Sequence, residues 1–128
     1  MKKDYINWSK KKSYVQNEKA RAFFHEREVW VCFLGENVGF EQDGSGEEYL
    51  RPVIVVHKCN NEVFIGIPLT RNLKKGKYYH VFDFENNKST AIISQVRLID
   101  AKRLKYKIGN ISQNNFVNLK EKIRNLFS

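Results

Sequence analysis

The stretch RPVIVVHKCNNEVFIGIPLT, residues 51–70, decides the fold of this chain. Residues 52–58 are apolar on both faces, which is typical of a strand at the centre of a sheet. Residues 63–69 form a second apolar run. Between the runs, Asn60 and Asn61 predict a tight turn, because asparagine tolerates a positive φ. The two runs are therefore expected to form an antiparallel hairpin.

Three more segments alternate in polarity or are rich in β-branched and aromatic residues, and each is expected to be a strand. They are residues 28–34, 78–84 and 90–100. The polar segment 85–88, ENNK, predicts the turn between the last two. Five strands in this order would make a bent, barrel-like antiparallel sheet.

The C-terminal segment predicts a helix that begins after Ser112, a suitable N-cap residue. Apolar residues follow it at helical spacing: Phe116, Leu119, Ile123 and Phe127. The expected fold class is therefore α+β, with a bent antiparallel sheet of five or more strands and a C-terminal helix.

Residues 1–27 differ in composition from the rest, because they hold eight Lys or Arg against three Asp or Glu. A weak helical pattern runs from Asn7 to Phe24. We therefore expect two parts: a basic, partly helical N-terminal arm over residues 1–27 and a barrel domain over residues 28–128. A partly disordered basic tail is the alternative interpretation of the arm.

The charge of the chain favours an anionic partner, since the net charge is +9 and the sequence pI is about 9.6. Nucleic acid, an acidic protein and an anionic membrane all fit that charge. No apolar run approaches the roughly 20 residues of a membrane span, and no secretory signal is evident, so we expect a cytoplasmic protein. Cys32 and Cys59 lie in apolar strand contexts and are expected to be buried thiols, although a disulfide between neighbouring strands stays open.

The residues that could hold a metal or act as a nucleophile are scattered. His25, His57 and His80 are not spaced for a shared ion, and the cysteines lack C-x-x-C spacing. No phosphate-binding glycine loop occurs. His57 and Cys59 could share one face, but plain packing at a strand end explains them better. We therefore expect neither a metal nor another cofactor.

A cation and a hydroxyl are expected to meet at one end of the hairpin. Arg51 begins its first strand and Thr70 ends its second, so topology places both at the open end, and Arg71 follows. An arginine can pair with phosphate oxygens while a hydroxyl donates a further hydrogen bond. The alternative is a solvated arginine that pairs with Glu47 or Glu48 of the preceding acidic loop.

Several segments, in order, resemble the MazF/PemK (Kid-like) toxin family. They are REVWVCFLGENVGFEQDGSGEEYLRPVIVV, IPLT, IISQVRLIDAKRL and KIG. The resemblance covers about residues 27–127. It implies an SH3-like barrel with a C-terminal helix, a homodimer, and metal-independent, sequence-selective cleavage of single-stranded RNA. It also implies a cognate antitoxin whose acidic, disordered tail lies over the RNA groove.

The resemblance assigns roles by position. Arg51 of LRPV resembles the catalytic arginine of the family, and Thr70 of PLT resembles its partner hydroxyl. The remaining expected RNA-binding residues are Glu41 and Gln42 of the first loop, Arg71, Lys74 and Lys75 of the second, and Ser94, Gln95 and Arg97 around the Q-x-R motif. The loop lysines could equally be a solvated polar loop. The RNA 2′-hydroxyl would attack the phosphorus, leaving a 2′,3′-cyclic phosphate and a 5′-hydroxyl.

Two positions depart from the family pattern. Phe40 stands where some members have histidine, and Ser94 stands where many have a carboxylate. The general base is therefore open, with Glu41, His57 and water as candidates. A catalytically silent RNA- or protein-binding module is the alternative function. A gyrase-inhibiting relative is disfavoured, because the chain ends in NLFS instead of an aromatic residue followed by glycine and an apolar residue.

Overall fold

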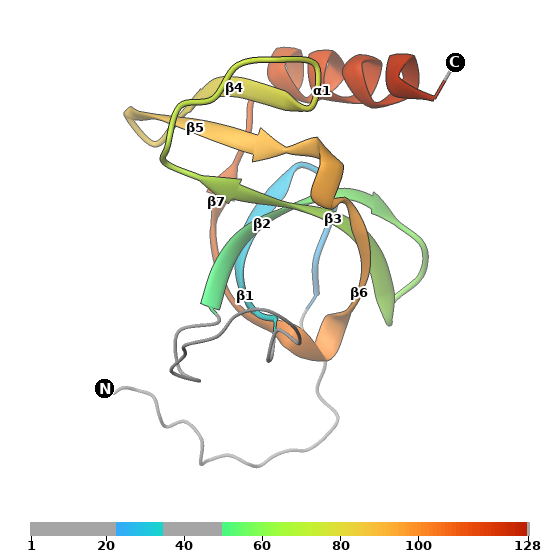
Figure 1. Cartoon of the computed structure of the whole chain (residues 1–128). Coiled ribbons are helices and arrows are strands. Elements are labelled where there is room, and N and C mark those ends of the chain that lie inside the picture. Colours follow the sequence, from blue (N-terminus) through green and yellow to red (C-terminus); the bar gives the residue numbers. More distant parts are fainter. Residues whose placement is uncertain (1–22, 35–49, 128) are drawn as a thin grey trace, which may run out of the picture.

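The computed structural model describes residues 23–34 and 50–127 (Figure 1). The elements in chain order are β1 (Glu28–Phe33), β2 (Leu50–Lys58), β3 (Val63–Thr70), β4 (Tyr79–Phe84), β5 (Asn87–Ile92), the 3-10 helix η2 (Ile93–Gln95), β6 (Arg97–Asp100), the 3-10 helix η3 (Ala101–Arg103), β7 (Leu104–Asn110) and α1 (Gln113–Leu126). The expected N-terminal helix lies outside the described residues except for Phe23 and Phe24, which are not helical.

The seven strands form one antiparallel sheet in the order β4-β5-β3-β2-β1-β7, with β6 paired to β3 off this path. Strands β1, β2, β3, β6 and β7 curl into a ring, and α1 lies along β4 (Figure 1). Within the described residues no ladder joins β6 to β7, so the sheet is strongly bent but not closed. The expected fold class is confirmed, and β2 is central as predicted, with β1 and β3 on either side.

The hairpin of β2 and β3 forms as expected, but its turn uses asparagine differently. The Asn60 side-chain oxygen Oδ1 accepts hydrogen bonds from the backbone N–H groups of Glu62 at 2.7 Å and Val63 at 3.0 Å. Positive φ occurs instead in the ENNK turn between β4 and β5, at Glu85 (53°) and Asn86 (66°). Asparagine thus stabilises the first turn as an acceptor.

The prediction of one strand over residues 90–100 is wrong. The segment forms β5, the 3-10 turn η2 and β6, and the backbone N–H of Ile93 donates to the Tyr78 carbonyl at 2.8 Å. The break lets one segment pair twice with β3. Thr90 of β5 lies opposite Thr70, whereas Arg97 of β6 lies opposite Gly66.

Three other differences concern exposed residues. Strand β7, which no sequence pattern predicted, pairs with β1 and leaves most of its side chains exposed. Phe127 lies beyond the end of α1 and is 77% exposed, so it does not continue the apolar face of the helix. Cys59 is exposed in the hairpin turn instead of buried, and both Cys32 and Cys59 are free thiols.

The predicted N-cap of the C-terminal helix is confirmed, because the Ser112 Oγ accepts a hydrogen bond from the Asn115 backbone N–H at 3.1 Å.

Two apolar clusters hold the fold together. The first joins the sheet to α1 and consists of Val29, Ile54, Val56, Ile67, Leu69, Phe82, Ala91, Ile93, Ile111, Phe116 and Leu119. The second fills the ring of strands and consists of Phe24, Trp30, Cys32, Val53, Val55, Phe64, Ile99, Ala101 and Leu104. Phe24 is fully buried in it and packs against Phe64, with the two rings tilted by 50° and their centroids 5.1 Å apart.

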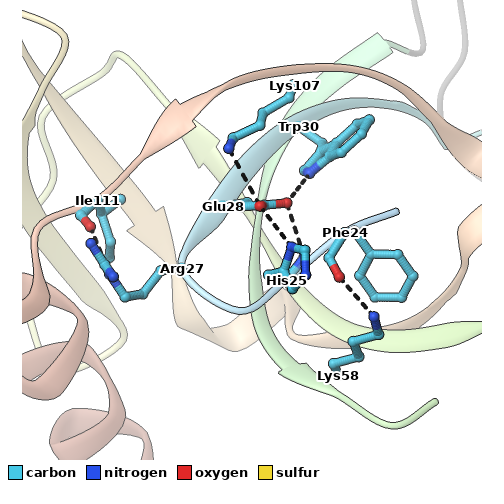
Figure 2. A network of polar contacts seen from close by, with 8 residues as sticks. All are labelled: Phe24, His25, Arg27, Glu28, Trp30, Lys58, Lys107 and Ile111. Atoms are coloured by element: carbon cyan, nitrogen blue, oxygen red, sulfur yellow. Dashed lines mark hydrogen bonds and ion pairs between the residues drawn. The ribbon is translucent and has the colours of Figure 1, made fainter. Parts of the chain in front are cut away.

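A buried carboxylate anchors the chain where it enters β1 (Figure 2). Oε1 of Glu28 accepts hydrogen bonds from Trp30 Nε1 and the His25 backbone N–H, both at 2.9 Å. Its other oxygen, Oε2, lies 3.3 Å from Lys107 Nζ. Burial acts to raise the pKa of Glu28, but the hydrogen bonds outweigh it and lower that pKa below its usual value. Lys58 adds a bond to the Phe24 carbonyl at 2.8 Å, so residues 24–28 are held on the ring.

Candidate functional site

The structure brings Arg51 and Thr70 to the same end of the β2–β3 hairpin. Arg51 lies in β2 opposite Cys32 of β1 and is half-buried. Its guanidinium Nη2 donates to the backbone carbonyl of Leu69 at 3.4 Å, and Leu69 immediately precedes Thr70 at the end of β3. As the sequence predicted, the hairpin therefore places a cation and a hydroxyl at its open end.

The chemistry of this pair suits an anionic ligand. Burial lowers the pKa of the Arg51 guanidinium from its usual value, but arginine titrates so far above neutral pH that the charge is retained. The hydroxyl of Thr70 accepts a hydrogen bond from the Asn72 backbone N–H at 3.2 Å. Because that bond uses an oxygen lone pair, the hydroxyl proton is left to donate to a ligand.

The other predicted site residues are spread around this pair. Arg71, Lys74 and Lys75 are exposed after the end of β3, and the Lys74 ammonium lies 6.0 Å from the ring centre of Tyr79. Ser94 and Gln95 are exposed in η2. Arg97 begins β6 and is also exposed. Glu41, Gln42, Glu47 and Glu48 lie outside the described residues, and so does the proposed pairing of the last two with Arg51.

Arg103 is a further cation on this side of the ring that the sequence did not single out. Its Nη1 donates to the Phe33 carbonyl at 3.1 Å. Burial raises the pKa of the Cys32 thiol to about 12, while the charges of Arg103 and Arg97 act in the opposite direction. Both arginines therefore lie within electrostatic reach of Cys32, whose strand neighbour is Arg51. The sequence feature that could have pointed to Arg103 as a cation of the site is the K-R-L segment in which it lies.

A cleft of about 360 Å³ opens beside Thr70. Its lining residues are Pro52, Leu69, Thr70, Arg71, Phe84, Glu85, Asn87, Ser89 and Ile108. Only Thr70 and Arg71 among them were expected at the site. The cleft forms where the β4–β5 turn meets β7, a contact that no local sequence pattern reveals.

The described residues limit the other possibilities. They contain no group of three or more His, Cys, Asp or Glu side chains that could hold a metal ion. Nor does any helix among them have the length and apolar character needed to cross a membrane. Within the described residues no hydrogen bond joins the His57 ring to the Cys59 thiol, and His57 Nδ1 lies 3.3 Å from a Glu26 carboxylate oxygen.

Solved structures define the class of this fold. The chain is similar to the Mycobacterium tuberculosis toxin MazF-mt6, with a TM-score of 0.61 and 18% identity over 79% of this chain and 96% of that one. It is equally similar to MazF from Deinococcus radiodurans, with a TM-score of 0.61 and 16% identity over 83% of this chain and 98% of that one. At such low identity these likenesses show the fold, which is that of MazF toxins.

The family follows from the sequence itself. Residues 25–127 match the family model described as the PemK-like, MazF-like toxin of type II toxin-antitoxin systems. The chain therefore belongs to this toxin family, and the resemblance given by its motifs is confirmed. A comparison with curated protein sequences gave no match.

Proposed function

We propose that this toxin is a sequence-selective, metal-independent endoribonuclease that cleaves single-stranded RNA. The observation that supports the proposal is the Arg51–Thr70 pair, which is fixed at one strand end by the Arg51 bond to the Leu69 carbonyl. A cation and a hydrogen-bond donor can together hold a phosphodiester, and this end of the hairpin offers both.

The proposed reaction uses the substrate as its own nucleophile. The RNA 2′-hydroxyl attacks the adjacent phosphorus, the bond to the 5′-oxygen breaks, and the products carry a 2′,3′-cyclic phosphate and a 5′-hydroxyl. Arg51 stabilises the charge that develops on the non-bridging oxygens, and Thr70 donates a hydrogen bond to the same phosphate. DNA resists because it lacks the attacking hydroxyl.

The candidates for the general base are narrowed by position. His57 lies six residues from Arg51 along β2, about 20 Å away at the rise of a strand, so it cannot act at the same phosphate. Ser94 carries a hydroxyl in place of a carboxylate and is a poor base at neutral pH. Glu41 and a water molecule are the bases that we propose to test.

The partners follow from the same proposal. Single-stranded RNA would be the substrate, and a cognate antitoxin with an acidic, disordered tail would compete for the cationic site. The net charge of +9 favours both ligands. A toxin that cleaves mRNA would act in the cytoplasm, as a homodimer.

The proposal is tested with purified full-length protein and a mixed single-stranded RNA in EDTA, followed by mapping of the product ends. We expect cyclic phosphate and 5′-hydroxyl ends at a limited set of sites, and a single 2′-deoxy substitution at a cut site should protect it. Intact RNA in the presence of folded, antitoxin-free protein contradicts the proposal.

Arg51→Ala tests the assignment of the cation. We expect a loss of cleavage of at least about 100-fold, because one preorganised donor at the developing charge has an effect of that size. Arg124→Ala is the matched control, since Arg124 is exposed on α1 and only loosely paired with Glu121 at 3.8 Å. If Arg51→Ala and Arg124→Ala cleave RNA equally well, Arg51 is not a catalytic residue.

A silent RNA- or protein-binding module is the second candidate function. Ser94 favours it, because this exposed hydroxyl stands where many relatives have a carboxylate. The same assay separates the two functions: a silent module binds RNA, with tighter binding at low salt, and leaves it uncut.

A further inference from the structure

The cleft beside Thr70 has the composition of a small-molecule subsite. Four apolar residues form its walls: Pro52, Leu69, Phe84 and Ile108. Glu85, Asn87 and Ser89 supply polar groups along one side, and Arg71 lies where β3 ends. Mostly apolar walls with a few convergent polar groups are typical of ligand pockets, and a volume near 360 Å³ lies within their usual range.

The polar side of the cleft is held in place by the hairpin turn. Glu85 and Asn86 both have positive φ, which gives the β4–β5 connection a tight two-residue turn. That turn lies beside β7 (Figure 1). A Cβ atom at Gly109 would lie 2.6 Å from Glu85 Oε2 and 3.5 Å from the Phe84 ring, so glycine permits the close approach. The Phe84 ring and the Glu85 carboxylate therefore lie against β7 at Gly109.

The chemistry of these groups fits a nucleobase. Single-stranded RNA is recognised by bases that pack on aromatic rings and form hydrogen bonds along their edges. Phe84 supplies a ring, and the Glu85 carboxylate accepts hydrogen bonds but cannot donate them. Among the described residues, that carboxylate has no hydrogen-bond or ion-pair partner. An acceptor of this kind selects a ligand that presents N–H donors and disfavours an anion.

We propose that the cleft is a subsite for a guanine base of the RNA, next to the phosphate bound by Arg51 and Thr70. The subsite rests on the proposed function. Guanine presents two adjacent donors, N1–H and N2–H, that one carboxylate can accept together. The Asn87 amide donates one N–H to the Glu85 backbone carbonyl at 3.4 Å, and its second N–H is left for the neighbouring O6. The Leu69 carbonyl that binds Arg51 belongs to a residue lining the cleft, so base and phosphate subsites are contiguous.

Binding is measured apart from cleavage with 2′-O-methyl oligouridines that contain one central G, A, C or U, because these lack the attacking hydroxyl. The wild-type full-length protein should bind the guanine oligonucleotide about tenfold more tightly than the others. Glu85→Gln should lose this preference, because the new amide presents a donor to the donors of guanine. Titration with 5′-GMP should shift the methyl NMR signals of Ile108 and Leu69.

Asp83→Asn is the matched control, since it removes the same charge from the same hairpin. Asp83 pairs with Lys88 at 2.8 Å and does not line the cleft, so the variant should keep the guanine preference. Equal binding of all four oligonucleotides overturns the subsite, as does a guanine preference that survives in Glu85→Gln. Cleavage of ordinary RNA is scored separately. If Glu85→Gln cuts RNA with unchanged selectivity, the guanine subsite is contradicted and the nuclease proposal stands. If the protein binds guanine selectively but cleaves no RNA, only the nuclease proposal is contradicted.

Discussion

Thr90 is a fully buried residue whose hydroxyl has no hydrogen-bond partner among the described residues. It lies in β5 directly opposite Thr70. A buried hydroxyl without a partner loses its hydration and gains nothing in return. We therefore predict that Thr90→Val, which keeps the shape and removes the hydroxyl, raises the free energy of unfolding by about 1 kcal/mol.

Urea denaturation of the two proteins measures that difference. Thr90→Ser is the control, because it retains the hydroxyl and removes the methyl group, and it should destabilise the protein. A Thr90→Val variant that is less stable than the wild type would mean that the hydroxyl is satisfied in solution, for which Thr70 is the nearest cross-strand group.

Gly66 of β3 lies in closely packed surroundings inside the ring. A Cβ atom there would lie 2.6 Å from Val53 Cγ1, 2.9 Å from Phe64 Cε2 and 3.0 Å from Ile99 Cδ1. All three neighbours belong to the buried cluster inside the ring, so none can move freely into solvent. We predict that Gly66→Ala lowers the free energy of unfolding by about 1–3 kcal/mol, the usual cost of overpacking a core.

Gly109→Ala is the control that separates overpacking at Gly66 from the effect on stability that any change of glycine to alanine has. Its added methyl group would meet the carboxylate end of Glu85, which is exposed and can turn away. Chemical denaturation should therefore show a smaller loss at Gly109 than at Gly66. Equal losses would mean that the ring interior is looser than its contacts indicate.

The packing of α1 on β4 makes the stability of the protein depend on pH through His80. Burial lowers the pKa of His80, the nearby charge of Lys122 lowers it further, and a hydrogen bond with Asn115 acts in the opposite direction. The unfolded chain therefore binds a proton at higher pH than the folded one. Stability is present above the ordinary histidine pKa of about 6.5 and is lost as the pH falls from there toward the lower folded pKa.

The measurement is the free energy of unfolding of the wild type and of His80→Phe at neutral pH and at pH 5. The wild type should lose more stability than the variant over this interval, since a phenylalanine ring fills the site without titrating. If both proteins lose the same free energy of unfolding, the acid sensitivity comes from groups other than His80. Glu28, whose folded pKa is lowered from 4.5, contributes equally to both proteins and therefore cancels in the comparison.

The sequence predicted those elements that have a clear apolar pattern. β2 and β3 are continuous apolar runs that are buried on both faces, and α1 has apolar residues at helical spacing. The break within residues 90–100 escaped prediction, since the apolar run continues through Ile92 and Ile93 while the backbone turns to reach the other half of β3. β7 escaped because pairing with β1, not burial, makes it a strand.

The same limit applies to the candidate site. Arg51 and Thr70 were predictable together, because the ends of a hairpin meet whenever its turn is correctly placed. The cleft was not, because Glu85 approaches Ile108 and Gly109 only after the β4–β5 hairpin folds against β7. Local patterns therefore predict positions along a strand, whereas clefts depend on which turns pack on which strands.

At the scale of the whole molecule, one apolar face of the sheet is not covered by any of residues 23–34 and 50–127. Phe33 of β1 lies opposite Leu50 of β2, and they are 41% and 42% exposed. Tyr106 of β7, opposite Val31, is 59% exposed. Alternation along β2 places Leu50 on the same face as Ile54, which belongs to the cluster under α1. The core face thus continues beyond the part that α1 and the β4–β5 hairpin cover.

We propose that a second copy of the chain covers this face, which would form the expected homodimer. A dimer related by a two-fold axis uses the same patch on both subunits, so one charge introduced there enters the interface twice. Leu50→Asp should therefore shift the mass measured by light scattering from dimer to monomer. Val117→Asp is the matched control, because Val117 is 49% exposed on α1, which covers another part of the sheet, and this variant should remain a dimer. A wild-type protein that is monomeric at every concentration, or a Leu50→Asp protein that stays dimeric, would assign the uncovered face to another partner.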